Sequence, residues 1–154
     1  DPASVAVVGA SRTTGKVGHD VVRNLIEAGY RGVIHPVNPK AVPVLDRPAY
    51  ATILDVPDPV DVAHVIVRNT LVPQVLQDCA ARGVKVAIVN TSGFKELRAE
   101  EGRGLEERLS AFSKQEGLLV VGPNCMGPYR PAAHLTPWGA IPGLPGPVGM
   151  EGLK

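Results

Sequence analysis

The chain has 154 residues, 44% of them hydrophobic and 20% charged, which is enough for one domain with its own core. Its net charge of +1 gives no electrostatic reason to expect nucleic acid or an anionic membrane as a partner. No apolar run approaches the roughly 20 residues of a membrane-spanning helix, and no signal peptide is recognisable. Two cysteines, Cys79 and Cys125, favour reduced thiols in the cytoplasm over a disulfide.

Short β-branched runs alternate along the chain with longer stretches of helical periodicity. Strands are predicted at residues 4–8, 32–37, 60–67, 84–89 and 118–121. Helices are predicted around residues 17–26, 71–80 and 105–112, with a short one near 51–54. This alternation is typical of βαβ units. It predicts a Rossmann-like, doubly wound α/β fold with a mainly parallel five-stranded sheet and flanking helices.

Proline and glycine become frequent after the fifth predicted strand. We therefore divide the chain into a domain at residues 1–130 and a Pro/Gly-rich tail or linker at residues 131–154.

The turn between the first strand and the first helix has the composition of a phosphate-binding loop. Backbone N–H groups and a helix N-terminus favour an anion there, and hydroxyl and basic side chains add donors. A dinucleotide fingerprint would need glycines two and five residues after Gly9, but Ser11 and Thr14 occupy those positions. The loop is therefore longer than the dinucleotide type, and an ordinary solvated loop is the alternative interpretation.

The end of the second strand lacks the acidic residue with which NAD enzymes bind the ribose hydroxyls. The sequence there is Pro36-Val37-Asn38-Pro39-Lys40. Lys40 favours a ligand with a phosphate on its adenosine ribose, which means NADP or coenzyme A (CoA).

Several segments together resemble one family, the CoA-binding domain of succinyl-CoA synthetase α subunits and of NDP-forming acyl-CoA (acetate–CoA) synthetases. The matching segments are VAVVGAS at 5–11, PVNPK at 36–40, DVPDPVDVAHVIV at 55–67, TSGF at 91–94 and GPNCMG at 122–127. The likeness covers roughly residues 1–130, and GPNC is its most specific element.

The resemblance implies a CoA site along the carboxyl ends of the strands. The phosphates are expected along the first loop, at Gly9, Ser11, Arg12, Thr13, Thr14, Gly15, Lys16, Val17 and Gly18. The nucleotide end is expected at Asn38, Pro39 and Lys40, and the rest of the crevice at Val67, Arg68, Thr91, Ser92, Gly93, Asn124 and Cys125. The chain departs from the family at Arg68-Asn69, where a proline-alanine pair is common.

The resemblance also implies that catalysis needs parts not recognisable in this sequence. In the family's full enzymes a histidine of a second domain carries the phosphate, and an ATP-grasp domain or subunit supplies it. We expect no catalytic residue here: His19 is placed on a helix surface, His35 and His64 in strands, and His134 in the tail. Cys125 is expected to have a packing role, and no metal-ligand spacing is present.

The sequence therefore predicts the CoA-binding domain of an NDP-forming acyl-CoA ligase, which makes acyl-CoA from a carboxylic acid, CoA and a nucleoside triphosphate. By itself it is expected to bind CoA or acyl-CoA without ligation. A stand-alone or regulatory CoA-sensing module and an NADP-binding oxidoreductase or redox-sensing domain remain as alternatives.

Overall fold

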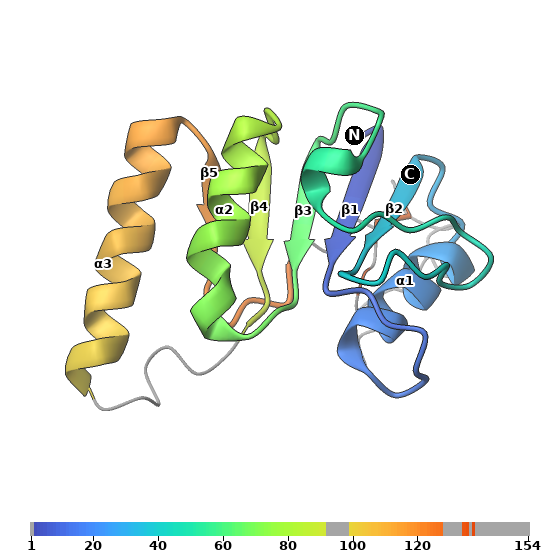
Figure 1. Ribbon diagram of the computed structural model, residues 1–154, viewed down its shortest axis with the longest axis horizontal. Coiled ribbons are helices and arrows are strands. Elements are labelled where there is room, and N and C mark those ends of the chain that lie inside the picture. Colours follow the sequence, from blue (N-terminus) through green and yellow to red (C-terminus); the bar gives the residue numbers. More distant parts are fainter. Residues whose placement is uncertain (1, 92–98, 128–133, 136, 138–154) are drawn as a thin grey trace, which may run out of the picture.

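The computed structural model describes residues 2–91, 99–127, 134–135 and 137, and its described part contains one five-stranded sheet (Figure 1). The strands are β1 (Ser4–Val8), β2 (Val33–Val37), β3 (Val62–Val65), β4 (Val86–Val89) and β5 (Leu119–Val121). The α-helices are α1 (Val17–Glu27), α2 (Val72–Ala81) and α3 (Ala99–Glu116), and η1 (Ile53–Asp55) and η2 (Asn69–Leu71) are 3-10 turns.

The sheet is entirely parallel, in the order β2-β1-β3-β4-β5. The predicted doubly wound α/β fold is thus confirmed. In β1 all five residues are buried, as is typical of a strand with both faces covered. The chain first runs outward from β1 to β2 and then returns to the other side of β1 at β3. Ligands of such sheets bind beyond the carboxyl ends of the strands at this reversal point.

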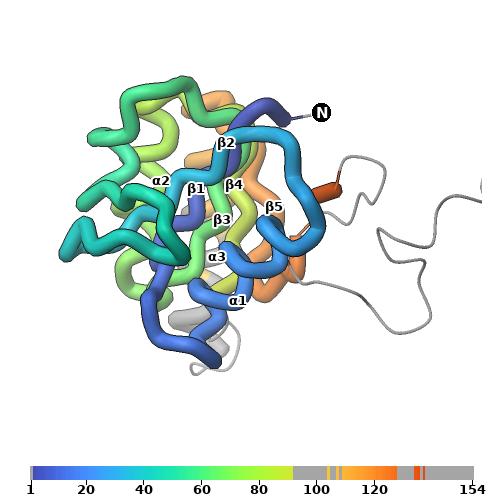
Figure 2. Tube along the Cα trace, turned by 90° about the vertical axis from the view of Figure 1, so that its right-hand side faces the viewer, coloured from blue at the N-terminus to red at the C-terminus, as the bar shows by residue number. Residues whose placement is uncertain are grey.

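Two separate apolar cores cover the two faces of the sheet. One face packs against α2, η1 and α3, through residues such as Leu76, Ile53 and Leu109. The other packs against α1, where Val22 and Leu25 are fully buried. Seen from the β2 side, the segment around residues 40–50 lies on one side of the strands and α1 on the other (Figure 2).

The predicted elements are present, but several differ in type or extent. The third helix, α3, extends from Ala99 to Glu116, well beyond the stretch predicted around residues 105–112. The short helix expected near 51–54 is the 3-10 turn η1, and the third strand is shorter than the apolar run at 60–67. Val60 and Ile66 flank β3 without belonging to it, because an apolar run reports burial rather than pairing.

Two histidines differ from the sequence-based expectation. His19 is buried rather than on the helix surface, with its Nδ1 3.5 Å from Asp20 Oδ1. His134 does not stand apart from the domain, because its Nδ1 donates a hydrogen bond to the Ala28 carbonyl. Leu135 beside it is 3% exposed and belongs to the α1 core. The division at residue 130 remains a prediction, but these residues add to the packing of the domain.

Candidate functional site

Two glycines join the end of β1 closely to the start of α1. Gly9 has a φ of +96°, and a Cβ there would clash with the Ile66 carbonyl oxygen. A Cβ on Gly18 would clash with the Gly9 carbonyl oxygen. The first turn of α1 therefore sits directly on the carboxyl end of the sheet, where the sequence predicts phosphates.

The loop before α1 leaves the positive end of the helix available. Lys16 is the extended N-cap residue, and no side chain in the described part of the chain caps this helix. The loop is instead held internally, since Thr13 N–H donates to Ser11 Oγ at 3.0 Å and Lys16 N–H to the Thr13 carbonyl at 3.2 Å. Uncapped N–H groups at a helix N-terminus favour an anionic ligand.

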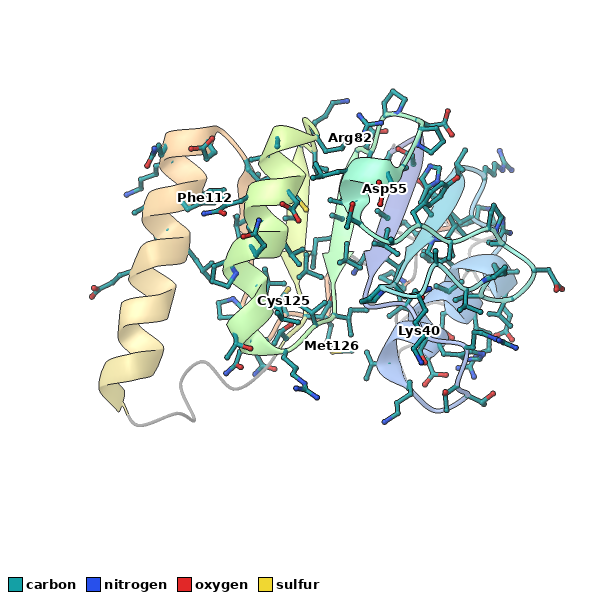
Figure 3. The ribbon with its side chains drawn as sticks, in the orientation of Figure 1. Lys40, Asp55, Arg82, Phe112, Cys125 and Met126 are labelled. Carbon is teal, nitrogen blue, oxygen red and sulfur yellow. The ribbon has the colours of Figure 1, made fainter. Side chains whose placement is uncertain are left out.

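A cavity of about 420 Å³, which we call the nucleotide cavity, brings this loop together with Lys40. It is lined by Ala10, Ser11, Arg12, Thr13, Asn38, Pro39, Lys40 and Val42. Asn38 shapes the turn that carries Lys40, because its Oδ1 accepts hydrogen bonds from the N–H groups of Lys40 (3.2 Å) and Val42 (3.3 Å). Lys40 itself is exposed and points toward the carboxyl end of the sheet (Figure 3). Two separate sequence predictions, the loop and the lysine, thus meet in one cavity.

A second, mostly apolar cavity of about 160 Å³ lies between β1, β2 and α2. Val8, Gly9 and Pro39 line it together with Ile53 of η1, and Asp78 and Gln74 supply polar groups. The sequence analysis did not include its α2 and η1 residues. The spacing of residues in the sequence does not show which helix packs beside the carboxyl ends of β1 and β2 and so helps to line this cavity.

The third cavity, here called the crevice, measures about 780 Å³ and lies over the ends of β3 and β4. It is lined by Val17, Ile66, Val67, Arg68, Asn69, Thr70, Asn90, Thr91 and Asn124. Val17, at the start of α1, connects the crevice with the phosphate loop. The predicted residues Val67, Arg68, Thr91 and Asn124 meet here, whereas Ser92 and Gly93 lie outside the described residues.

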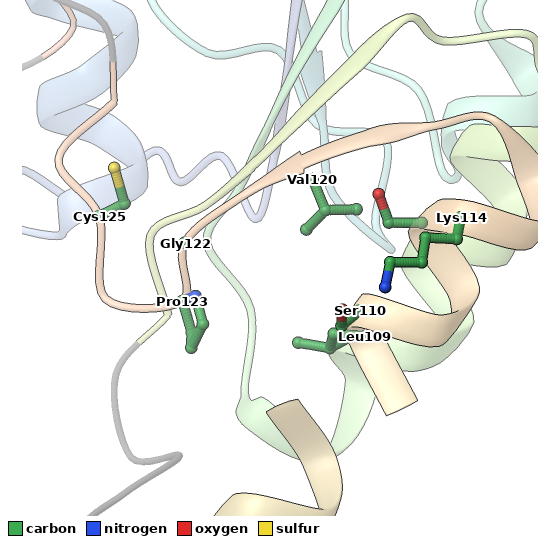
Figure 4. A pocket seen from close by; sticks show the side chains of 8 residues that line it. Leu109, Ser110, Lys114, Val120, Gly122, Pro123 and Cys125 are labelled. Atoms are coloured by element: carbon green, nitrogen blue, oxygen red, sulfur yellow. The ribbon is translucent and has the colours of Figure 1, made fainter. Parts of the chain in front are cut away.

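Cys125 does not line the crevice, although the sequence grouped it with Asn124. It lines a separate cavity of about 570 Å³ between α3 and β5, with Ser110, Lys114 and Val120 (Figure 4). Asn124 before it has a φ of +52°. The Sγ atom of Cys125 accepts a hydrogen bond from the Gly127 N–H at 3.3 Å.

Asn90 is a crevice residue that the sequence analysis missed. It directly follows β4, so the general position of ligands beyond carboxyl ends could have identified it. Its Nδ2 donates to the Cys125 carbonyl at 2.5 Å, and its Oδ1 lies 3.1 Å from His64 Nδ1. His64 is fully buried on β3, and desolvation lowers its pKa to about 4, against a smaller opposing effect of the bond to Asn90. The imidazole is therefore neutral at pH 7.

Among the described residues no group of three or more acidic, histidine or cysteine side chains is arranged to hold a metal ion. No helix in this part of the chain is both long and apolar enough to span a membrane.

The family model of the CoA-binding domain matches residues 3–130. The chain belongs to the CoA-binding domain family. Coenzyme A is the ligand of this domain, as the family resemblance implied, whereas Lys40 and the loop by themselves left NADP and CoA open. The family match thus covers all four cavities and the whole described sheet.

Relatives of this CoA-binding domain include larger ligases. The chain is 42% identical over 155 residues to the α subunit of an ADP-forming acetate–CoA ligase of Pyrococcus furiosus, covering 97% of the chain and 33% of the relative. It is 45% identical over 126 residues to an ADP-forming acetate–CoA ligase of Archaeoglobus fulgidus, covering 82% of the chain and 19% of the relative. The chain thus spans about a third or less of the length of these relatives.

Solved structures show the same fold. A dinucleotide-forming acetyl-CoA synthetase of Ca. Korarchaeum cryptofilum, solved with phosphate and ADP, superposes with a TM-score of 0.83 at 41% identity, covering 91% of the chain and 30% of that protein. A hypothetical protein from Pyrococcus horikoshii superposes with a TM-score of 0.63 at 29% identity, covering 81% of the chain and 79% of that protein.

Proposed function

We propose that this CoA-binding domain works as part of an NDP-forming acyl-CoA ligase, in which it holds CoA while other parts activate the carboxylic acid. The observation that supports this most is the common position of the phosphate loop and Lys40 in the nucleotide cavity. The ligase relatives that cover nearly the whole chain point in the same direction.

In the proposed complex, CoA lies along the carboxyl ends of the strands. Its 3′-phosphate lies near Lys40, and its pyrophosphate lies against the loop at Ser11–Thr13 and the N-terminus of α1. The pantetheine arm then continues past Val17 into the crevice, where Thr91 and Asn124 offer polar contacts. The crevice volume of about 780 Å³ is in the range of small-molecule sites.

We propose that ligation requires a phosphohistidine domain and an ATP-grasp domain or subunit besides this domain. The described histidines support this division of labour. His35 and His64 are buried within strands, and His19 and His134 are hydrogen-bonded to Asp20 and the Ala28 carbonyl. We also propose a cytoplasmic location, since Cys79 and Cys125 are both free thiols.

Titration calorimetry with four ligands tests the proposal. CoA should bind most tightly, dephospho-CoA more weakly for lack of the 3′-phosphate, and NADP and NAD more weakly still. Tighter binding of NADP than of CoA, or equal affinity for CoA and dephospho-CoA, would contradict it and favour the NADP-dependent alternative.

A CoA-sensing module is the second candidate. The solved hypothetical protein from Pyrococcus horikoshii supports it, because a protein of this fold is not much longer than the aligned region. Both candidates bind CoA, so the discriminating measurement is acyl-CoA formation from acetate, ATP and CoA after addition of both the phosphohistidine domain and the ATP-grasp subunit of a related ligase. A product formed only with phosphohistidine-bearing partners supports the ligase, and acyl-CoA-dependent changes in an attached effector domain support the sensor.

A further inference from the structure

His64 and Asn90 connect the middle of the sheet to the loop at residues 122–127, hereafter the GPNC loop. His64 lies on β3 without solvent contact, yet its neighbour in the hydrogen-bond chain, Asn90, lines the crevice. This series of hydrogen bonds runs from His64 Nδ1 to Asn90 Oδ1 (3.1 Å) and from Asn90 Nδ2 to the Cys125 carbonyl (2.5 Å).

The Cys125 carbonyl determines which atom donates and which accepts in both hydrogen bonds. A backbone carbonyl can only accept, so the Asn90 amide must direct its NH₂ group to Cys125 and its oxygen to His64. That oxygen in turn requires a proton on His64 Nδ1. The Nε2 atom then carries the lone pair, and it is buried without a hydrogen-bond partner among the described residues. Such an unpaired buried atom has a cost in stability.

Other contacts show how closely the GPNC loop fits this pair. A Cβ on Gly127 would come within 2.9 Å of His64 Cε1, so the loop lies on the imidazole ring. The Asn124 N–H donates to the Thr91 carbonyl at 3.0 Å, and the Cys125 N–H to the Val89 carbonyl at 3.3 Å. Asn124, which lines the crevice, is therefore held against the carboxyl end of β4.

We infer that His64 and Asn90 are positioning residues for the pantetheine end of the CoA site. Through the Cys125 carbonyl they hold the GPNC loop, and thereby Asn124, in place over the crevice. The nucleotide cavity shares no lining residue with this chain of bonds, so its affinity is independent of them. The inference rests on the proposed path of CoA.

The test compares CoA with adenosine 3′,5′-bisphosphate, which carries the nucleotide end but no pantetheine arm. His64→Leu removes the donor to Asn90 without touching the crevice. We expect its Kd for CoA to rise roughly five- to tenfold, the effect of a lost hydrogen bond or two, with the Kd for the bisphosphate unchanged. His64→Gln, whose amide can still donate to Asn90, should recover most of the affinity.

His35→Leu is the matched control. His35 is also a buried strand histidine with an unpaired Nε2, but it lies on β2 and makes no bond to the GPNC loop. Its replacement should leave the ratio of the two dissociation constants unchanged. Equal weakening of both ligands in His64→Leu, or no change in either, would overturn the inference.

A measurement on the unmodified chain covers the case in which His64→Leu does not fold. Nitrogen-15 NMR of the imidazole should show a neutral His64 protonated on Nδ1. Protonation on Nε2 instead would break the link to Asn90 and overturn the inference. If the unmodified chain binds the bisphosphate and CoA with equal affinity or binds neither, the proposed path of CoA fails, whereas the NMR result still decides whether the His64–Asn90 link exists.

Discussion

At the scale of single residues, Lys40 is expected to distinguish CoA from dephospho-CoA. In Lys40→Ala the Kd for CoA should rise roughly three- to tenfold, because one exposed cation no longer faces the 3′-phosphate. The Kd for dephospho-CoA should stay the same. Calorimetry at two salt concentrations measures both, and the difference between the ligands should shrink at high salt.

Lys85 provides the control for this variant. It is also exposed, but its Nζ lies 2.6 Å from Asp61 Oδ1, before the start of β4 and thus at the amino end of the sheet. Lys85→Ala should leave the affinities for both ligands unchanged. A similar loss in both lysine variants would mean that only the net charge matters.

His64 should make the domain less stable in mild acid. Its pKa is about 4 in the folded chain, against about 6.5 unfolded, because burial disfavours the charged form. Between pH 6.5 and pH 4 the imidazole of His64 is protonated in the unfolded chain but neutral in the folded chain. The free energy of unfolding therefore falls as the pH falls through this range. From pH 7 to pH 5 the loss is about 2 kcal/mol.

Urea unfolding at the two pH values, compared between the unmodified chain and His64→Gln, measures this effect. The variant should lose less stability than the unmodified chain. Part of the dependence should remain, since burial also lowers the pKa of His35. An equal pH dependence in both proteins would contradict the assignment.

At the scale of elements, the contact between β1 and α1 determines the shape of the phosphate loop. In Gly18→Ala the new methyl group would meet the Gly9 carbonyl, so α1 must move away from the sheet. We expect a loss of about 1–3 kcal/mol in the free energy of unfolding and weaker binding of CoA. Denaturant unfolding and calorimetry measure the two effects.

Gly104→Ala is the matched control in α3, where a Cβ would meet nothing within 4 Å. It should stabilise the chain by about 0.5–1 kcal/mol through helix propensity and leave CoA binding unchanged. If Gly18→Ala behaved like Gly104→Ala, the close approach of α1 to β1 would be wrong.

The elements themselves were largely predictable from the sequence, for a physical reason. A strand covered on both faces needs apolar residues throughout, and the runs at 5–8 and 86–89 have this property. The burial of His19 was not predictable in this way. Helical periodicity ranks positions by their neighbours on the same helix, whereas His19 is buried by the closeness of α1 to β1 that Gly18 permits.

The site was predictable to the extent that it depends on carboxyl ends of strands. The loop before α1 and Lys40 follow neighbouring parallel strands, so their meeting in one cavity is a consequence of the fold. The separation of Asn124 and Cys125 into two cavities was not predictable, because both residues follow the same strand, β5, and the sequence does not show which cavity each will line.

At the scale of the whole molecule, the two cores and the carboxyl edge have different roles. The cores on either face bury the strands and helices, while the phosphate loop, Lys40, η2 and the GPNC loop gather at one edge of the sheet. Exposed apolar side chains belong to the same elements: Val17 at the start of α1 is 43% exposed, Leu71 of η2 51% and Met126 of the GPNC loop 54%. Figure 3 shows Met126 near the carboxyl ends of the strands.

Asn124 and Cys125 are neighbours in the chain but line different cavities, so the reactivity of the Cys125 thiol can report on a ligand in the crevice. Cys79 is buried and its pKa is raised to about 12, chiefly by desolvation, so a thiol reagent at pH 8 should label the partly exposed Cys125 alone. A ligand that contacts Asn124 from the crevice steadies the backbone on which Cys125 faces another cavity. CoA should therefore slow the labelling without shielding the sulfur, and adenosine 3′,5′-bisphosphate should not. The rate at which the thiol reagent labels Cys125, followed by stopped-flow absorbance, would then measure occupancy of the crevice without an added tag or a partner enzyme.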